Sequence, residues 1–135
     1  MIEINNFTKF AVDKRFFLGV AKKVLKGENR ERENLSIVLI TPKEMQELNR
    51  KYRKKNKSTD VLSFEKNPGF IEDVNEIVIC PAVIKKNGLR YKIAFKKELE
   101  KILIHGVLHI LGYDHEISKA EEKKMDKKQK YYLSK

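Results

Sequence analysis

The apolar pattern over residues 95–111 does most to limit how this chain can fold. It contains nine large apolar side chains that point in nearly every direction around a helix axis: Phe95, Leu99, Ile102, Leu103, Ile104, Val107, Leu108, Ile110 and Leu111. A helix that is apolar on all sides is buried rather than lying on a surface. The exception is a narrow stripe that holds His105 and His109. The pattern therefore predicts a central buried helix that carries two histidines.

Strand and helix patterns are mixed along the rest of the chain. Runs rich in β-branched residues predict strands at 1–6, 35–41, 59–65 and 75–81, and helical periodicity predicts helices at 8–26, 42–53, 118–133 and, more weakly, 82–94, where Asn87-Gly88 interrupts the pattern. Gly27 is a natural C-cap, Thr41 with Pro42 marks a helix start, and Ser118 with Glu121 fits a capping box. We expect an α+β fold, in which a small mixed sheet of about four strands packs against helices.

Length and composition suggest a single domain over residues 1–135, because a chain of this length can bury a real core. It has no run of about 20 apolar residues that would span a membrane. Its first residues lack the charged-then-apolar pattern of a secretory signal. Cys80 is the only cysteine, which excludes an internal disulfide and favours a reducing compartment. We expect a cytoplasmic protein with no membrane partner.

The charge is strongly positive, with 30 Lys and Arg against 19 Asp and Glu, or +11. Such a charge suggests a polyanionic partner, nucleic acid first, although a lysine-rich or heat-adapted proteome is the alternative. Its distribution favours the first explanation. The segment RKYRKKNK, residues 50–57, has six basic residues and no acid, whereas the last 20 residues mix seven lysines with four acids. One dense patch on a diffuse background favours a phosphate-binding site.

Within this basic segment, Arg53 differs from its neighbours. It ends the predicted helix 42–53, where a cation complements the helix dipole, and its guanidinium can also bind phosphate oxygens in a bidentate way. Lys54, Lys55 and Lys57 are more interchangeable point charges, which as solvated loop residues need no function. We predict that Arg53 and these three lysines contact nucleic acid.

The stretch HGVLHILGYDH, residues 105–115, contains all three histidines of the chain. His105 and His109 are four residues apart and so lie on one helix face, where their imidazoles can bind one ion at about 2.0–2.1 Å. Gly112 lets the chain leave the helix, and the turn that follows can bring back His115 as a third ligand. Three protein ligands leave one coordination position open, as in catalytic zinc sites.

The residue after the first histidine separates this site from zinc peptidases. They share the histidine spacing, but a glutamate follows their first histidine and takes a proton from water on the zinc ion. Gly106 stands in that place and makes a peptidase the least favoured interpretation. Phosphodiester cleavage depends more on cations, because charge accumulates on phosphoryl oxygens. Asp114 is either a base or orienting partner, or a turn former after the glycine.

Two segments together, HGVLHILGYDH (105–115) and LNRKYRKKNKSTDVLSF (48–64), resemble the YbeY family of bacterial metal-dependent single-strand endoribonucleases, which are implicated in ribosomal RNA maturation. NEIVIC (75–80) resembles the family's Gly-Asp/Glu-Ile-x-Ile strand, and Met125 and Gln129 also match its pattern. The chain departs from that pattern at Lys54, Ser58 and Asn75, where the family often has glycine, proline and glycine, and the loop 66–74 follows no family pattern.

The resemblance implies an enzyme and a set of site residues. His105, His109 and His115 would bind one zinc ion per chain, with nickel or another divalent metal as alternatives, and Arg53 and His115 would act in catalysis. The substrate would be single-stranded RNA, such as a precursor of 16S-type ribosomal RNA, with the ribosome or ribosomal proteins as further partners. The main alternative is a non-catalytic RNA-binding ribosome-assembly factor, in which the metal only fixes the turn at 112–115.

Overall fold

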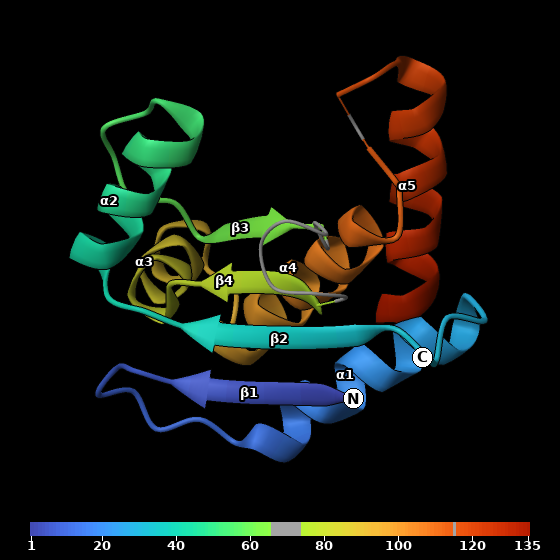
Figure 1. Cartoon of the computed structure of the whole chain (residues 1–135), viewed down its shortest axis with the longest axis horizontal. Coiled ribbons are helices and arrows are strands. Elements are labelled where there is room, and N and C mark those ends of the chain that lie inside the picture. Colours follow the sequence, from blue (N-terminus) through green and yellow to red (C-terminus); the bar gives the residue numbers. More distant parts are fainter. Residues whose placement is uncertain (66–73, 115) are drawn as a thin grey trace.

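The structure, a computed structural model, describes residues 1–65, 74–114 and 116–135 (Figure 1). In chain order the elements are β1 (Ile2–Asn6), α1 (Lys14–Gly27), β2 (Asn34–Leu39), α2 (Pro42–Arg53), β3 (Val61–Phe64), β4 (Val74–Ile79), α3 (Pro81–Tyr91), α4 (Phe95–Ile110) and α5 (Lys119–Leu133). These elements confirm the predicted α+β class and each predicted strand and helix, apart from shifted ends. Among the described residues, no helix has both the length and the apolar composition needed to span a bilayer.

The four strands form one mixed sheet in the order β1-β2-β4-β3. β1, β2 and β4 are parallel, and β3 runs antiparallel to β4, as the arrow directions in Figure 1 show. β1 lies at one edge of the sheet, and β3 lies at the other. The position of β3 matters for function because an edge strand leaves one side of its backbone outside the sheet.

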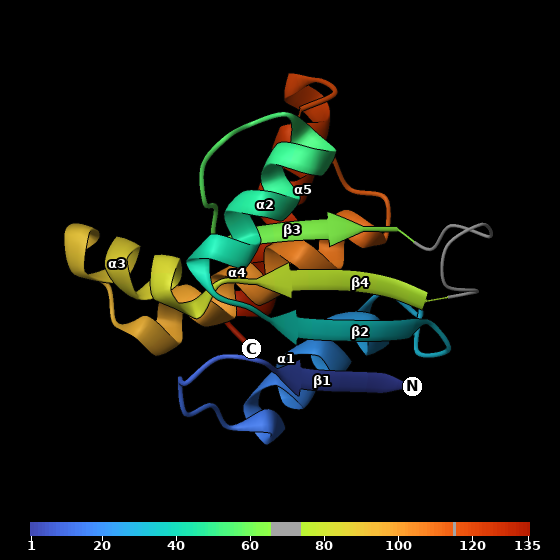
Figure 2. The same ribbon diagram turned by 60° about the vertical axis from the view of Figure 1, so that its left-hand side comes forward.

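Successive strand side chains point to opposite faces of the sheet, which gives this sheet two cores. The larger core joins one face to α1 and α4, and its buried strand residues are Ile4, Leu35, Ile37, Leu39, Ile77 and Ile79. The smaller core lies on the other face, where Leu62 and Val78 pack with Met45 of α2 and with Cys80. Figure 2 shows α2 crossing in front of the strands, with α4 behind them. Helices therefore cover the sheet on both sides.

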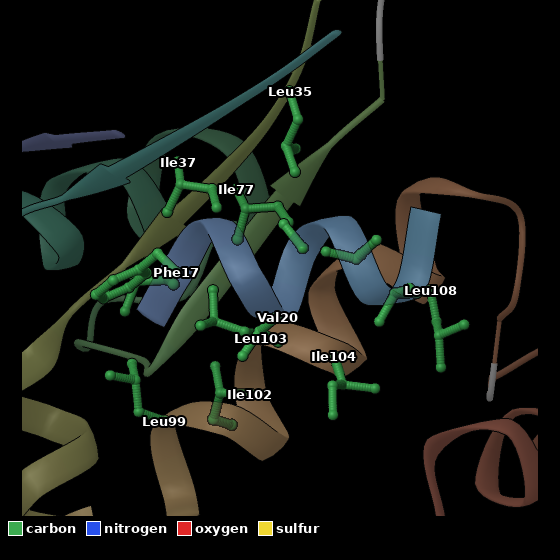
Figure 3. Close-up of a cluster of buried hydrophobic side chains, with 14 of the residues drawn as sticks. Phe17, Val20, Leu35, Ile37, Ile77, Leu99, Ile102, Leu103, Ile104 and Leu108 are labelled. Atoms are coloured by element: carbon green, nitrogen blue, oxygen red, sulfur yellow. The ribbon is translucent and has the colours of Figure 1, made fainter. Parts of the chain in front are cut away.

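The helix α4 is buried, as its apolar pattern predicts. Leu103, Ile104, Val107 and Leu108 have no exposed surface. Figure 3 shows side chains of α4, among them Leu99 and Leu103, in one cluster with Phe17 and Val20 of α1. Each such side chain stabilises the fold by about 1.5–3 kcal/mol when it leaves water. This packing fixes how far α4 is rotated about its axis, and so fixes where its histidines point.

The predicted helix 8–26 is wrong at its start, because α1 begins at Lys14. The side chain of Asn6 accepts a hydrogen bond from the backbone N–H of Thr8 at 2.9 Å, which holds these residues in a turn. Asp13 then caps the helix with its carboxylate. Short polar side chains that bond the nearby backbone compete with helix formation, and here they delay it.

The predicted role of Gly27 as C-cap is also wrong. It is the last residue of α1, and the cap is Glu28, whose φ is −95°. A Cβ atom on Gly27 would collide with the phenol ring of Tyr132 in α5. Glycine is required here because another helix approaches closely, not because the backbone is left-handed.

The ends of the other helices differ from the predicted ends by a few residues at most. The predicted helix 82–94 starts at Pro81 and ends at Tyr91, because Lys92 has a φ of 58°. Asn87-Gly88 lies inside that helix and does not interrupt it. At the start of α2, Thr41 and Glu44 form a complete capping box, whereas at α5 the Ser118 hydroxyl accepts from the N–H of Glu121 at 3.2 Å.

Candidate active site

A cleft of about 370 Å³ opens along the edge strand β3. Its lining comes from the end of α2, from β3, from the last turns of α4 and from the turn after α4: Tyr52, Arg53, Val61, Leu62, Ser63, Phe64, His105, His109, Asp114 and Glu116. Figure 1 shows β3 at the edge of the sheet, between α2 and the turns that lead to α5. The cleft brings Arg53 together with His105 and His109, which are more than 50 residues away in the sequence.

Each of the two cleft histidines is oriented by a hydrogen bond between its Nδ1 and an oxygen atom. His105 Nδ1 lies 3.2 Å from Oε1 of Gln129 in α5, and His109 Nδ1 lies 3.2 Å from the carbonyl oxygen of Tyr113. A carbonyl oxygen only accepts, so Nδ1 donates in each contact, and in the neutral imidazole Nε2 then carries the lone pair. Metal-binding histidines in proteins have this arrangement. The pair therefore fits a divalent transition metal held through Nε2.

The third predicted ligand, His115, lies outside the described residues. Within residues 1–65, 74–114 and 116–135, no three His, Cys, Asp or Glu side chains are placed to hold a metal ion together. The chain turns after α4 as expected, with Gly112 at a φ of +105°. Asp114 and Glu116, on either side of position 115, both line the cleft. The structure thus places His105 and His109 in one cleft, and the metal-binding role of all three histidines stays a prediction.

Asp114 has a role within the turn. Its Oδ1 accepts a hydrogen bond of 2.8 Å from the backbone N–H of Glu116. This contact is the usual way in which an aspartate stabilises a turn. Of the two roles considered for Asp114, the structure therefore shows the turn-forming one, and the side chain also borders the cleft.

Gly106, the residue in the place of the peptidase glutamate, faces the sheet. A Cβ atom there would lie 3.2 Å from Cγ2 of Ile77 and 3.6 Å from Oγ of Ser63. The Ile77 side chain would have to shift slightly to admit even a methyl group at this position. The close packing of α4 on β3 and β4 thus favours glycine at this position.

A carboxylate at the end of α1 fixes the partners of both histidines. Glu28, with 11% of its side chain exposed, accepts hydrogen bonds from the Tyr113 hydroxyl at 2.7 Å and from the Tyr132 hydroxyl, and pairs with Lys128 at 3.2 Å. We name these four residues the Glu28 clasp. It joins α1 to the turn that holds the Tyr113 carbonyl and to α5, which carries Gln129.

The electrostatics of the Glu28 clasp keep it in one protonation state. Burial raises the pKa of the Glu28 carboxyl, but hydrogen bonds from Tyr132, Tyr113 and Lys128 outweigh it and hold this pKa below its ordinary value. Burial, followed by the hydrogen bond to Glu28, raises the pKa of Tyr113 to about 12. At neutral pH the carboxylate is ionised and both phenols donate. No sequence pattern indicated this cluster, because Glu28 is 85 and 104 residues from the two tyrosines.

On the opposite side of the cleft, Arg53 is the last residue of α2 and is exposed. The helix stops there because Lys54 adopts a left-handed conformation, with φ 55° and ψ 32°, and its N–H bonds to the carbonyl of Asn49. Glycine adopts this conformation with no penalty, whereas lysine does not. Lys54 therefore ends α2 in a conformation that favours glycine.

The loop after α2 folds back along the helix. Asn49, which is 2% exposed, donates from its amide to the carbonyl of Lys57 at 2.9 Å, and Ser58 donates to the carbonyl of Pro42 at 2.7 Å. Lys54, Lys55 and Lys57, all described and exposed, do not line the cleft. Their predicted contact with nucleic acid therefore concerns the surface beside the cleft rather than the cleft itself.

The fold and the cleft define a class of protein: an α+β protein in which a buried helix presents two histidines beside an edge strand, opposite an arginine. A family model described as Endoribonuclease YbeY matches residues 3–135. The chain belongs to the YbeY family.

Individual relatives agree with this assignment. Endoribonuclease YbeY of Bdellovibrio bacteriovorus is 46% identical over 105 residues, which cover 77% of this chain and 67% of that protein. Endoribonuclease YbeY of Thermotoga neapolitana is 41% identical over 100 residues, covering 74% and 65%. The matched stretches thus span about two-thirds of these relatives. The solution structure of TM1509 from Thermotoga maritima is similar with a TM-score of 0.68 at 30% identity, covering 98% of this chain and 87% of that one.

Proposed function

We propose that this protein is a metal-dependent endoribonuclease that cuts single-stranded RNA. The observation that carries the proposal is the cleft itself, in which an exposed arginine lies opposite two histidines oriented as metal ligands. The names of its relatives support an RNA substrate. We further propose that it acts in the cytoplasm on precursors of 16S-type ribosomal RNA, in contact with the ribosome or ribosomal proteins.

His105 and His109 would hold one zinc ion per chain, with His115 as the third ligand; nickel or another divalent metal would suit the same nitrogens. When bound, such a metal supplies Lewis acidity and lowers the pKa of water to about 7. The described residues support this role because Gln129 and the Tyr113 carbonyl hold both imidazoles by Nδ1. A metal ligand held in this way needs little reorganisation to bind.

Arg53 would bind and stabilise the reacting phosphate. Its planar guanidinium can donate two parallel hydrogen bonds to phosphoryl oxygens, and these bonds strengthen as negative charge accumulates there. Its exposed position at the end of α2 lets it meet a substrate that enters from solvent. Lys54, Lys55 and Lys57 would raise the local positive potential and attract the RNA backbone.

Two other interpretations receive less support. If the metal only fixed the turn at 112–115, the turn would lack other anchors, but Tyr113 is already bonded to Glu28 and Asp114 to the backbone of Glu116. A zinc peptidase would need a glutamate directly after the first histidine, and this chain has Gly106 there, packed against Ile77.

The test measures metal content and RNA cleavage together. Bound metal per chain and cleavage of a labelled single strand and its duplex are compared for wild type, His109→Ala and Lys101→Ala. Lys101 is the matched control, because it is exposed on the same helix. We expect about one metal per chain and cleavage of the single strand in wild type and control. Both should be lost in His109→Ala.

A well-folded wild type that stays metal-free when zinc is supplied would contradict the proposal. Thermal melting with a chelator separates the remaining alternatives. Removal of a catalytic metal leaves the protein folded but inactive, whereas removal of a structural metal unfolds it. The second result, with RNA binding but no cleavage, would indicate an RNA-binding assembly factor.

A further inference from the structure

An aromatic pair lies in the cleft beside Arg53. Tyr52 of α2 and Phe64 of β3 both line the cleft, and their ring centroids are 5.3 Å apart with an interplanar angle of 69°. They come from different elements on either side of a loop. No run of interleaved aromatic residues therefore indicates the pair in the sequence. The fold brings them together at the opening along β3.

The ring of Tyr52 is supported on one side and accessible on another. Phe64 contacts it edge to face, which limits its motion, while Tyr52 keeps 44% of its surface exposed. The ammonium of the exposed Lys51 lies 5.3 Å from the centroid of the Tyr52 ring. A ring face that a solvated lysine can reach is not packed against the protein interior, so another flat group can take the lysine's place.

A nucleobase fits this description best. Bases stack on exposed aromatic faces in proteins that bind single strands, and every base has a face that can do so. Bases inside a duplex already stack on their neighbours, so only an unpaired base is free to bind in this way. Arg53, the next residue along the chain, is the cation proposed for the phosphate, and Lys51 would be released to a second phosphate.

We propose that Tyr52, held by Phe64, forms a stacking subsite for one unpaired nucleobase next to the phosphate bound by Arg53. The inference rests on the proposed function, and it names the feature that selects single strands. It predicts preference for unpaired RNA with little preference among bases, because stacking reads the face of a base and not its edges.

The chain provides a closely matched control. Tyr131 in α5 is 51% exposed, contacts Tyr132 edge to face at 5.0 Å, and has the ammonium of Lys135 at 4.8 Å from its centroid. It thus shares the exposure, the supporting ring and the neighbouring cation of Tyr52, but it does not line the cleft. A difference between the two tyrosines would therefore report position and not general aromatic or charge effects.

The experiment measures affinity for labelled single-stranded RNA by stopped-flow fluorescence anisotropy at fixed salt, before cleavage proceeds. We expect Tyr52→Ala to weaken binding about 5- to 100-fold, Tyr52→Phe to bind like wild type, and Tyr131→Ala to change little. The same measurement is repeated with a series of RNAs in which one abasic nucleotide occupies successive positions. One position should weaken wild-type binding, and the same RNA should cause no further loss in Tyr52→Ala.

The outcomes separate this inference from the proposed function. If wild type binds and cleaves RNA but Tyr52→Ala equals Tyr131→Ala, or no abasic position is coupled to Tyr52, stacking is wrong and the enzyme proposal stands. If wild type neither binds nor cleaves single strands, both the stacking subsite and the proposed function are wrong. Should Tyr52→Ala unfold, Tyr52→Leu fills the space against Phe64 without an aromatic face, and full affinity in that variant would overturn the subsite.

Discussion

The two walls of the cleft are built in opposite ways. On the α4 wall, each histidine is fixed by an oxygen atom, and the Glu28 clasp holds the chain segments that carry those oxygens. On the α2 wall, the cation of Arg53 is exposed at the end of a helix. A metal needs ligands held in place before it binds, whereas a flexible polyanion is met better by side chains that can adjust.

This contrast predicts two kinds of variant. Substitutions on the α4 wall should change metal retention and stability, and those on the α2 wall should change RNA binding and rate while metal content stays the same. The following predictions test that separation, beginning with the largest effect.

Arg53→Ala should lower kcat/KM for single-stranded RNA by about 100- to 1,000-fold, because it removes a charged donor to the phosphate. Metal content should stay at the wild-type value. Arg50→Ala is the control, since Arg50 is an exposed cation one turn earlier in α2 that does not line the cleft. Cleavage kinetics and metal analysis of both variants check this. Loss of metal in Arg53→Ala, or an equal loss of rate in Arg50→Ala, would contradict the contrast between the walls.

Gln129→Ala should weaken metal affinity about 10- to 100-fold, the usual effect of removing a partner that orients a ligand. Gln129→Glu keeps an acceptor oxygen for His105 Nδ1 and should retain most of the affinity. Competition with a zinc chelator of known affinity measures both. Lys130→Ala, an exposed change next to it, controls for effects on α5. If Gln129→Ala bound metal like this control, Gln129 would have no orienting role.

Glu28→Gln should destabilise the protein by about 1–3 kcal/mol at pH 7, because an amide cannot accept from both phenols as a carboxylate does. The folded-state pKa of Glu28 is lowered, so its ionisation stabilises the fold above the ordinary glutamate pKa of about 4.3. That contribution is lost as the pH falls through the lower folded-state value. Urea unfolding of wild type and variant should therefore show a difference that is full at pH 7 and narrows below about pH 4. A difference independent of pH would argue against the ionised clasp.

Lys54→Gly should stabilise the protein by up to about 1 kcal/mol, since lysine is strained at the left-handed position that ends α2. RNA affinity should fall only a few-fold with the lost charge. Lys92→Gly is the matched variant, because Lys92 ends α3 in the same conformation and lies outside the cleft. It should show the same gain in thermal melting with no effect on RNA. If both glycine variants were less stable than wild type, the left-handed conformation of the two lysines would not be a source of strain.

The sequence predicted what depends on neighbours in the chain. The spacing of His105 and His109 placed both on one helix face, and the apolar pattern around them predicted burial of α4. The predicted start of α1 was wrong because a polar turn at Asn6 and Thr8 overrides the helical periodicity. Gln129 was noted only as a family match, because its contact with His105 spans 24 residues and no local period reports such a contact. The Glu28 clasp was missed for the same reason.

The contact between Gln129 and His105 also has a consequence in time. A ribosome adds residues from the first to the last, so both described histidines are made well before the glutamine that orients the first of them. Until α5 docks on α4 and Tyr132 reaches Glu28, the imidazole of His105 lacks this support. We therefore expect the cleft to reach its final geometry only when the last helix takes its place, after both histidines have been made.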